Sequence, residues 1–468
     1  MPDAVIAHLA NQRDAILERL FALLRIPSVS TDPAFAPHMD AARAMLLARL
    51  RAIGLQDVQL LDGGSGQPAV YGAWTGAPGK PTLIVYGHYD VQPADPIELW
   101  NTPPFEPTVR DGRIYARGAS DVKGSTTIAI ETVAAFLAVT GGCPINVKLF
   151  LEGEEEVGSP SLRAIVARHG DKLVADAMLS ADGGKASTTV PTVGIGGRGI
   201  TGLELTLRTG TKDGHSGRYG GAARNALREI AALLATIHDA QGRILVEGFG
   251  DDATPISNAA RAAAAALPFD EAEFFGNIGG TRWGDPNYTV RELTTLRPTI
   301  ELNGLWGGYT GAGSKTVLPA EAHAKITMRL SPGMAPDKAS AALQAHLRAH
   351  LPKGVSLEVS PEIGGTPANS LPEDHPMLRA ALAVLQQVHG QAAFPARAGG
   401  SIPITSIFKE LLGMEAMTFG LAMPDEDVHA PNEFFRLSSF DEGLKTWPML
   451  FSELGKFSAR DFQNKAKA

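Results

Sequence analysis

The 468-residue sequence predicts an α/β fold with a smaller α+β domain inserted into it. The α/β part is indicated by short apolar runs of strand-forming residues, separated by segments with helical periodicity. The inserted part is indicated by a change of pattern after Gly183, where a glycine-rich stretch leads into segments of alternating apolar and polar residues. Such alternation is typical of antiparallel strands with one exposed face. We place the inserted domain at about residues 197–382 and the α/β domain at 1–196 and 383–468.

The composition favours a well-packed protein of two or three domains. Hydrophobic residues make up 44% of the chain and charged residues 20%, which supports a sizeable core. The formal net charge of -8 provides no basic surface for nucleic acid or an anionic membrane. The single cysteine, Cys143, cannot form an internal disulfide, residues 1–20 do not read as a secretory signal, and no apolar run reaches transmembrane length. We therefore expect a soluble cytoplasmic protein with no nucleic-acid or membrane partner.

Helices and strands alternate in the first 182 residues. Helical periodicity covers residues 11–24 and 38–53, and Gly54 suits the left-handed position that ends a helix. Another helix is expected at 125–139, and Ser159 followed by Pro160 predicts the start of one more. Strands are expected at residues 57–61, 69–74, 82–88, 146–152 and 177–182.

The inserted part combines half-exposed strands with helices. Strands are expected at 203–208, 321–330 and 355–360. Helices are expected at 337–351, at the alanine cluster 262–266, and from the N-cap Asn225 to about residue 241. A helix at 376–389 is expected to lead the chain back to the first sheet.

Acids and a histidine follow four of the predicted strands of the first domain. They are His88 with Asp90, then Asp121 after a shorter strand in the segment 113–118, the run Glu154–Glu156, and Asp182. Ligands bind beyond the carboxyl ends of strands in such sheets, so these side chains would meet at one rim. The alternative is a set of independent polar turns and helix caps, in which three adjacent glutamates would repel one another. A cation between them removes that repulsion, and an imidazole can bind a metal while a carboxylate orients its other nitrogen.

One further ligand candidate lies in the second half of the chain. His429 stands in the acidic loop 423–433, which follows an apolar run at 416–420. Taken alone, such a histidine is more simply explained as an exposed imidazole without a ligand.

The spacing of these motifs resembles the dinuclear-zinc peptidase family that contains carnosinase, cytosolic non-specific dipeptidase, bacterial glutamate carboxypeptidase and acetylornithine deacetylase. The resemblance covers nearly the whole chain and is strongest to the carnosinase and non-specific dipeptidase branch. It is carried by residues 87–93 (GHYDVQP), 117–124 (RGASDVKG), 152–159 (EGEEEVGS), 180–182 (SAD), 215–217 (HSG), 315–319 (KTVLP), 329–332 (RLSP) and 397–403 (RAGGSIP).

The resemblance implies a three-layer catalytic domain with a mixed, mostly parallel sheet, and an inserted lid and dimerisation domain. It implies two Zn²⁺ per subunit, with Mn²⁺ or Co²⁺ as other metals that such a site accepts. His88 and Asp182 would hold one ion, Glu156 and His429 the other, and Asp121 would bridge them. Asp90 would orient His88, Glu155 would be the general base, and Glu154 would be a solvated bystander. A cis peptide bond is expected between Asp121 and Val122.

The resemblance also implies substrate-binding residues. His215 would reach the active site of the partner subunit and donate to the oxyanion, although a glycine-rich loop also suits a surface imidazole. Arg329 would bind the substrate carboxylate through two parallel hydrogen bonds, unless it is a strand arginine that faces solvent. Thr316, Gly400 and Ser401 are weaker candidates at the same carboxylate, since Gly399 and Gly400 also suit a tight turn.

The sequence therefore predicts a homodimeric metallopeptidase that hydrolyses dipeptides or short peptides. The alternative is an N-acyl amino acid deacetylase or aminoacylase with the same dinuclear site. A non-catalytic binding module would require the loss of a ligand or of the base, and every one of these positions is filled.

Overall fold

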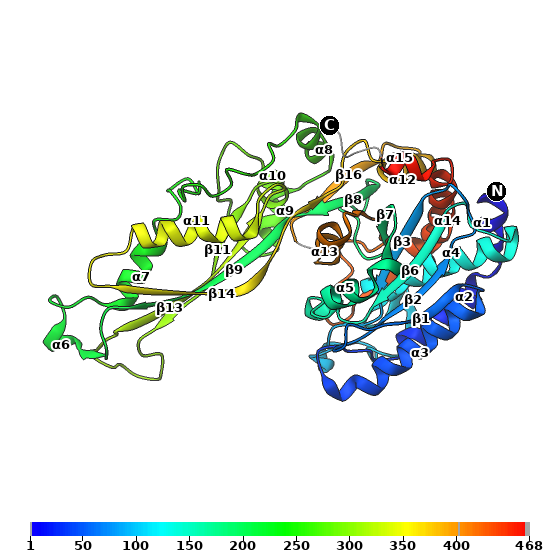
Figure 1. Ribbon diagram of the computed structural model, residues 1–468. Coiled ribbons are helices and arrows are strands. Elements are labelled where there is room, and N and C mark those ends of the chain that lie inside the picture. The colour runs from blue at the N-terminus through cyan, green and yellow to red at the C-terminus, as the bar shows by residue number, and fades with distance from the viewer. Residues whose placement is uncertain (1, 401–402, 464–468) are drawn as a thin grey trace.

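The computed structural model describes residues 2–400 and 403–463. Its two main sheets, one large sheet of nine strands and one smaller sheet of four, form two parts placed side by side (Figure 1), and two further sheets have two and three strands. The nine-stranded large sheet has the order β1-β2-β6-β3-β7-β17-β8-β15, and β16 also pairs with β8. Its strands are β1 (Gln56–Leu61), β2 (Ala69–Trp74), β3 (Thr82–His88), β6 (Asn146–Glu152), β7 (Ala177–Ser180), β8 (Thr192–Gly197), β15 (Asn369–Ser370), β16 (Phe394–Ala398) and β17 (Glu415–Thr418).

The large sheet is mixed, as predicted, and its centre is parallel. Strands β6, β3, β7 and β17 run parallel to one another, whereas β1, β2 and β6 pair antiparallel at one side. Near the other edge, β8 pairs antiparallel with β17 and β15 and parallel with β16.

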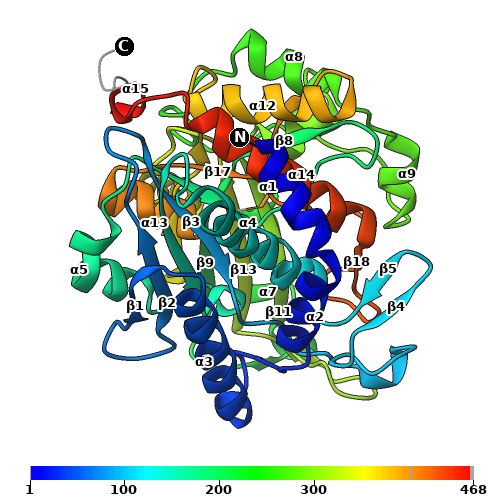
Figure 2. The same cartoon turned by 90° about the vertical axis from the view of Figure 1, so that its right-hand side faces the viewer.

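Helices cover both faces of the large sheet, which makes three layers. Alternate residues of β3 point into different cores: Leu83 and Val85 into one, Ile84 and Tyr86 into the other. The first core is closed by helices α1 (Pro2–Asn11), α2 (Arg13–Leu24), α3 (Ala36–Ala52), α4 (Gly124–Thr140), α12 (Pro376–His389) and α14 (Leu437–Leu454), several of which lie in front of the sheet in Figure 2. The second core is closed by α5 (Leu162–Leu173) and α13 (Pro403–Leu412).

The smaller sheet is antiparallel, in the order β11-β13-β9-β14. Its strands are β11 (Thr299–Gly307), β13 (Glu321–Leu330), β9 (Gly199–Arg208) and β14 (Ser356–Thr366). Helices α7 (Ala226–Leu234) and α11 (Pro336–Ala349) pack on one face and share a separate core with it. On β13, buried and half-buried residues alternate, as expected for a strand with one covered face.

Most of the predicted elements are present, with three differences. The helix that Asn225 caps ends at Leu234, not near residue 241. The prediction that Ser159 and Pro160 start a helix is wrong: Ser159 has a positive φ of 57°, and α5 begins only at Leu162. Several elements were not predicted from the sequence, among them helices α1, α13 and α14 and strands β8, β11 and β16.

One predicted domain boundary, at residue 197, lies where one strand ends and the next begins, whereas the other, at residue 382, lies inside a helix. Residue 197 ends β8, just before β9 starts the smaller sheet. Residue 382 lies inside α12, whose buried residues Met377, Ala381 and Leu385 belong to the core of the large sheet. The division of the chain into domains stays a prediction.

One segment, Ala119–Thr140, is long and apolar enough to cross a membrane by length and composition. Its most apolar 18-residue window has a mean hydropathy of 1.4, and 78% of that window is buried inside the fold. Because α4 forms the larger part of this segment, its apolar character is explained by its place in the core.

Candidate metal centre

The carboxyl ends of the central strands bring the predicted ligands together. His88 is the last residue of β3 and pairs in register with Glu152, the last residue of β6. On the other side, Tyr86 of β3 pairs with Ser180, the last residue of β7. Parallel strands that end level with one another leave the following residues at one edge of the sheet, which places Glu154–Glu156 and Asp182 near His88.

Asp121 reaches the same edge from the turn that precedes α4. A side chain at Gly87 would collide with Thr126 of α4, since a Cβ there would lie 2.2 Å from the Thr126 hydroxyl oxygen. Glycine before His88 therefore allows α4 to approach the end of β3. The peptide bond between Asp121 and Val122 is cis, as the resemblance implies.

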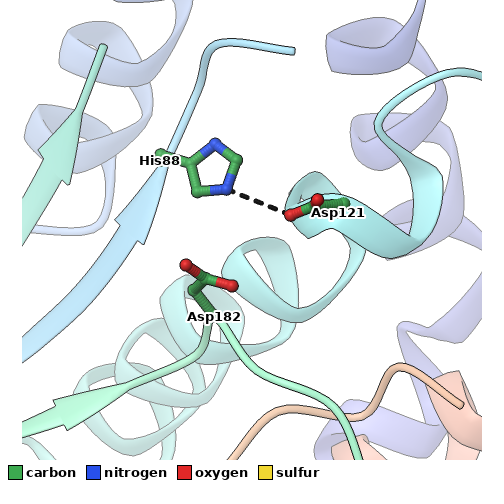
Figure 3. Close-up of side chains that lie close together, drawn as sticks. All are labelled: His88, Asp121 and Asp182. Atoms are coloured by element: carbon green, nitrogen blue, oxygen red, sulfur yellow. Dashed lines mark hydrogen bonds and ion pairs between the residues drawn. The ribbon is translucent and has the colours of Figure 1, made fainter. Parts of the chain in front are cut away.

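The first group of possible metal ligands consists of His88, Asp121 and Asp182 (Figure 3). One ligand atom from each lies within 4.8 Å of the others. The His88 Nε2 is 3.2 Å from the Asp121 Oδ1. His88 is buried, so this face of the group is shielded from solvent.

The second group consists of Asp121, Glu156 and His429. The His429 Nε2 lies 2.9 Å from the Asp121 Oδ2 and 3.1 Å from the Glu156 Oε2. Asp121 thus belongs to both groups, and its two oxygens face two different imidazoles. This is the arrangement that a carboxylate shared between two cations requires.

The charges of the two groups favour positive ions between them. Burial would raise the pKa of Asp121, but hydrogen bonds with His429 and His88 hold it well below its ordinary value. Hydrogen bonds to Asp121 and Glu156 raise the pKa of His429 to about 10. Burial, with the nearby charges of Asp121 and Glu156, raises the pKa of Asp182 to about 7 even though His88 opposes the shift. Carboxylates this close together repel one another unless protons or cations lie between them. The perturbed pKa values therefore indicate a place where a bound cation could take over the role of the protons.

The donor set also fits a divalent metal. Each group offers one imidazole, one carboxylate of its own and the shared Asp121. Three protein ligands leave a position for water or substrate, as in catalytic zinc sites. A metal cofactor is therefore supported by the chemistry of the residues present.

Glu155 lies beside these ligands and belongs to neither of the two groups found among the described residues. Burial raises its pKa to about 9, and the charges of Asp182, Glu156 and Asp121 add to the shift while His88 opposes it. An acid so close to two metal groups, and outside both of them, is placed to exchange protons with a bound molecule.

Asp90 and Gln92 contact His88 and Glu156, two of the possible ligands. The His88 Nδ1 lies 3.0 Å from the backbone oxygen of Asp90 and 3.4 Å from the Oδ1 of the Asp90 carboxylate. Both of these oxygens therefore face the ring nitrogen of His88 that points away from Asp121. The Asp90 Oδ2 also accepts a hydrogen bond of 3.1 Å from the Glu156 backbone N–H. The Gln92 amide donates to the Glu156 Oε2 at 2.9 Å. Gln92 carries no role in the sequence analysis, although it lies in the 87–93 motif.

The prediction that Glu154 is a solvated bystander is wrong, because its side chain is buried. Its carboxylate accepts hydrogen bonds from the backbone N–H groups of Gln67, at 2.9 Å, and Ser161, at 3.1 Å. Glu154 therefore caps the approach to α5 and ties it to the loop before β2.

His215 and Thr316 meet each other on the smaller part of the molecule. His215 ends β10 (Gly214–His215), and Thr316 directly precedes β12 (Val317–Leu318), which pairs antiparallel with β10; the His215 Nε2 lies 3.4 Å from the Thr316 hydroxyl oxygen. The Gly217 N–H donates to the His215 Nδ1 at 3.0 Å, which leaves the proton of a neutral ring on Nε2. Helix α6 (Ser216–Tyr219), which follows His215, lies at the end of the smaller part farthest from the large sheet (Figure 1). The structure of one chain does not bring His215 to the metal groups.

The remaining substrate candidates lie where the two parts join. Arg329 is the second-last residue of β13 and is half-buried, and burial lowers its pKa. The backbone oxygen of Gly399 accepts a hydrogen bond of 2.9 Å from the Arg198 Nε, which fixes the segment next to Gly400. Ser401 lies outside the described residues.

A three-layer α/β fold that gathers two ligand groups around one shared carboxylate defines a metal-dependent hydrolase. The chain belongs to peptidase family M20/M25/M40, whose profile matches residues 84–453. This confirms the family that the motifs predict, the fold class and the assignment as a metallopeptidase.

Individual relatives match over almost the whole chain. The chain is 30% identical to the Beta-Ala-His dipeptidase of Rattus norvegicus over 464 residues, which cover 95% of this chain and 94% of the relative. The structure of the M20 family metallo-carboxypeptidase Sso-CP2 from Sulfolobus solfataricus is similar, with a TM-score of 0.81, 30% identity, and coverage of 94% of this chain and 99% of that one. The di-peptidase Dug1p from Saccharomyces cerevisiae is similar with a TM-score of 0.78, 25% identity, and coverage of 98% and 99%.

Proposed function

We propose that this protein is a dinuclear metallodipeptidase that hydrolyses the peptide bond of dipeptides or short peptides. The observation that carries the proposal is the Asp121 carboxylate, whose two oxygens face the imidazoles of His88 and His429. The names of two similar proteins, a Beta-Ala-His dipeptidase and a di-peptidase, support dipeptides as the substrate class.

The proposed metal content is two Zn²⁺ per subunit, with Mn²⁺ or Co²⁺ as replacements. His88 and Asp182 would hold one ion, Glu156 and His429 the other, and Asp121 both. When bound, such ions polarise the substrate carbonyl and lower the pKa of a water molecule.

Glu155 is the proposed general base. It takes a proton from the water whose oxygen attacks the carbonyl carbon, and it gives that proton to the amine nitrogen as the carbon–nitrogen bond breaks. Glu155 lies next to Glu156 in the sequence and belongs to neither ligand group, so its carboxylate is free to hold the proton between these two steps. Asp90 keeps the His88 ring in place through its Nδ1.

The free carboxylate of the substrate is assigned to Arg329, with Gly400 and Ser401 as weaker contacts, and with Thr316 of the partner subunit as another because it lies beside His215. A guanidinium suits this task because it binds a carboxylate through two parallel hydrogen bonds. The smaller part, residues 197–382, would act as lid and dimerisation domain on the catalytic part, residues 1–196 and 383–468. We assign the protein to the cytoplasm.

The oxyanion is assigned to His215 of the partner subunit in a homodimer. Its Nδ1 accepts the Gly217 N–H, so its Nε2–H is available as a donor. The remote position of α6 from the large sheet supports an action across the subunit boundary (Figure 1).

Hydrolysis of dipeptides and N-acetyl amino acids at matched concentrations tests the substrate class. We expect kcat/KM to be higher for dipeptides by about tenfold or more, as the names of the two similar dipeptidases suggest. Matched pairs such as Ala-Leu and N-acetyl-Leu keep the same carboxylate end. Equal or faster cleavage of the N-acetyl compounds would make the protein an aminoacylase.

Replacing His215 tests the assignment of the oxyanion donor. We expect His215→Ala to lower kcat by ~10²–10³-fold with little change in KM, because the hydrogen bond forms mainly with the oxyanion. Mixing His215→Ala chains with Glu155→Gln chains should restore a substantial minority of the wild-type turnover after subunit exchange, since one site of each mixed dimer is complete. A tag on one variant verifies the exchange, and mixed dimers that stay inactive would show that His215 does not act in trans.

A further inference from the structure

Two buried glutamates flank His429 in the loop 423–433. Glu426 precedes it by three residues and Glu433 follows it by four, and both side chains are fully buried. Neither residue was singled out by the sequence, where both are simply members of an acidic loop. Each carboxylate is surrounded by hydrogen-bond donors, so each one organises the backbone around it.

Glu433 binds the segment that carries Asp121. Its Oε1 accepts hydrogen bonds from the backbone N–H groups of Ser120, at 3.0 Å, and Asp121, at 3.1 Å. Its Oε2 accepts from the Arg117 Nη1, at 2.7 Å, and the Gly118 N–H, at 3.0 Å. Four donors from residues 117–121 therefore fix the path of the chain at Asp121.

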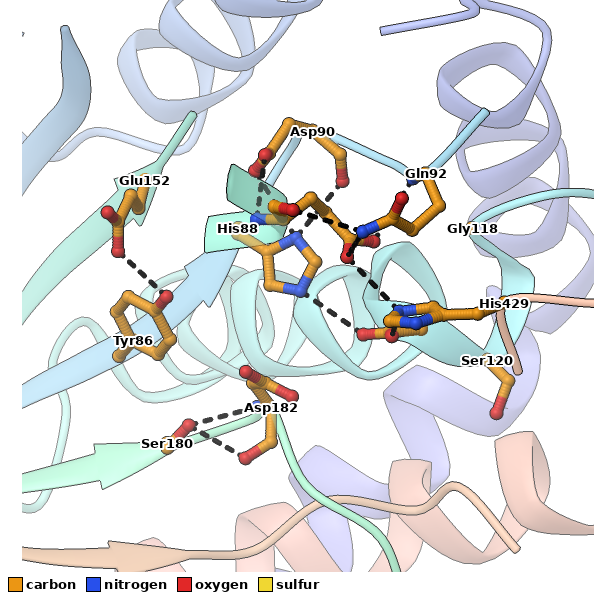
Figure 4. A network of polar contacts seen from close by, with 12 residues as sticks. Tyr86, His88, Asp90, Gln92, Gly118, Ser120, Glu152, Ser180, Asp182 and His429 are labelled. Atoms are coloured by element: carbon orange, nitrogen blue, oxygen red, sulfur yellow. Dashed lines mark hydrogen bonds and ion pairs between the residues drawn. The ribbon is translucent and has the colours of Figure 1, made fainter. Parts of the chain in front are cut away.

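Glu426 holds the other side of the same turn. Its Oε2 accepts a hydrogen bond of 2.6 Å from the Ser120 hydroxyl and one of 3.0 Å from the Met423 N–H. Its Oε1 accepts from the Arg436 guanidinium at 3.0 Å. Ser120 is thereby bound by Glu433 through its backbone and by Glu426 through its side chain, next to His429 and Gly118 (Figure 4).

The loop that carries His429 needs such support. The His429 side chain is 49% exposed, so packing of the ring does not determine its position. Three non-glycine residues of the loop, Asp427, His429 and Asn432, have positive φ angles of 49°, 63° and 67°. Such conformations persist where the surrounding structure holds them.

We propose that Glu433, together with Glu426, is a positioning residue that fixes Asp121 and His429 relative to one another before any metal binds. This inference rests on the proposed function, in which Asp121 and His429 are metal ligands. The two loops are more than 300 residues apart in the sequence, and these two carboxylates join them on either side of Ser120. Neither glutamate touches the substrate or the reacting atoms. Their effect is exerted through the ligands.

The substitution Glu433→Gln tests the inference without a change of shape. A glutamine keeps one accepting oxygen, and its NH₂ group must face either the pair Ser120 and Asp121 or the pair Arg117 and Gly118, all of which donate. We expect the metal dissociation constant, measured with Co²⁺ or Zn²⁺ against a chromophoric chelator, to rise by ~10–100-fold. Both ions should be affected, because Asp121 serves both groups.

Glu131 provides the matched control. It is also buried and also bound only by donors, namely Arg19 and Arg49, but it lies on α4 away from both ligand loops. We expect Glu131→Gln and Glu433→Gln both to lower the melting temperature of the metal-free protein. Glu131→Gln should leave the metal dissociation constant within about twofold of the wild type. Loss of a buried carboxylate alone is thereby separated from loss of ligand positioning.

A folded Glu433→Gln protein that binds metal as tightly as the wild type would overturn the inference. Ser120→Ala tests the part of Glu426 separately, since it removes only the hydroxyl that donates to Glu426, and an unchanged dissociation constant there would overturn the role of Glu426. A wild-type protein that binds no metal, or an Asp121→Ala protein that still binds two ions tightly, would instead refute the proposed function.

Discussion

The Glu155→Gln protein is expected to keep both metals and to lose nearly all turnover. The amide has almost the size of the carboxylic acid, but it cannot take a proton from water and pass it to the amine. Removal of a general acid–base group costs ~10²–10⁴-fold, and we expect the upper end because the same side chain acts in both halves of the reaction. Metal analysis and kcat on one dipeptide, measured on the same preparation, give the result.

Two controls make this result specific. Glu18→Gln replaces an exposed acid on α2 and should retain wild-type activity. Glu155→Asp keeps an acid but withdraws it by one methylene, and it should recover part of the rate that glutamine loses. Retention of a tenth of the wild-type rate by Glu155→Gln would remove Glu155 from the role of base. A loss of metal in parallel with activity would assign it to the ligands.

The Asp121→Ala protein is expected to bind less than one metal ion per chain and to have no measurable peptidase activity. Both groups lose a ligand at once, and the carboxylate that lies between His88 and His429 disappears. A protein that no longer binds metal also loses the stabilisation that binding provides, about 4 kcal/mol when the free metal is 1,000 times its dissociation constant. Metal analysis after gel filtration and thermal melting with and without added Zn²⁺ measure both effects.

The Asp121→Asn variant provides an intermediate case for comparison with Asp121→Ala. The amide offers one oxygen and no negative charge, so it can serve one ion but cannot bridge two. We expect it to retain more metal than Asp121→Ala and to remain far below the wild type in activity. Two tightly held ions in Asp121→Ala would be incompatible with a bridging carboxylate.

The sequence predicts well which side chains meet at this edge of the sheet, because their positions follow from simple geometry. His88 ends one strand and Asp182 follows another by two residues; both strands are recognisable as apolar runs, and parallel strands end at one edge of the sheet. The family resemblance then supplies the partners that geometry alone does not, such as His429 in a loop far along the chain. The structure places both kinds of residue within two compact groups.

The residues behind the ligands could not be predicted in this way. Glu433 and Glu426 accept hydrogen bonds from backbone N–H groups and a hydroxyl on a turn more than 300 residues earlier in the chain. Every residue except proline has a backbone N–H, so the residue type does not show which of these groups will be bound. Glu154 was misjudged for the same reason, since the N–H groups of Gln67 and Ser161 are its partners. The start of α5 was misplaced because Ser159 adopts a left-handed conformation, which its residue type does not suggest.

The predicted domain boundary at residue 382 shows a second reason why sequence patterns miss features of the fold. A helix at 376–389 was correctly predicted to lead the chain back to the large sheet, but its apolar face alone does not show where the return begins. Strand β15 already pairs with β8 at Asn369 and Ser370, before the helix starts. A two-residue strand is too short to give a periodic pattern.

The central claim is that Asp121 binds two metal ions at once. Diffraction data from Zn²⁺-loaded crystals, recorded on both sides of the zinc absorption edge, test it most directly. We expect two anomalous peaks per chain, each about 2.0–2.2 Å from a different carboxylate oxygen of Asp121, with His88 at one and His429 at the other. A single peak, or two peaks of which one lacks contact with Asp121, would contradict the account.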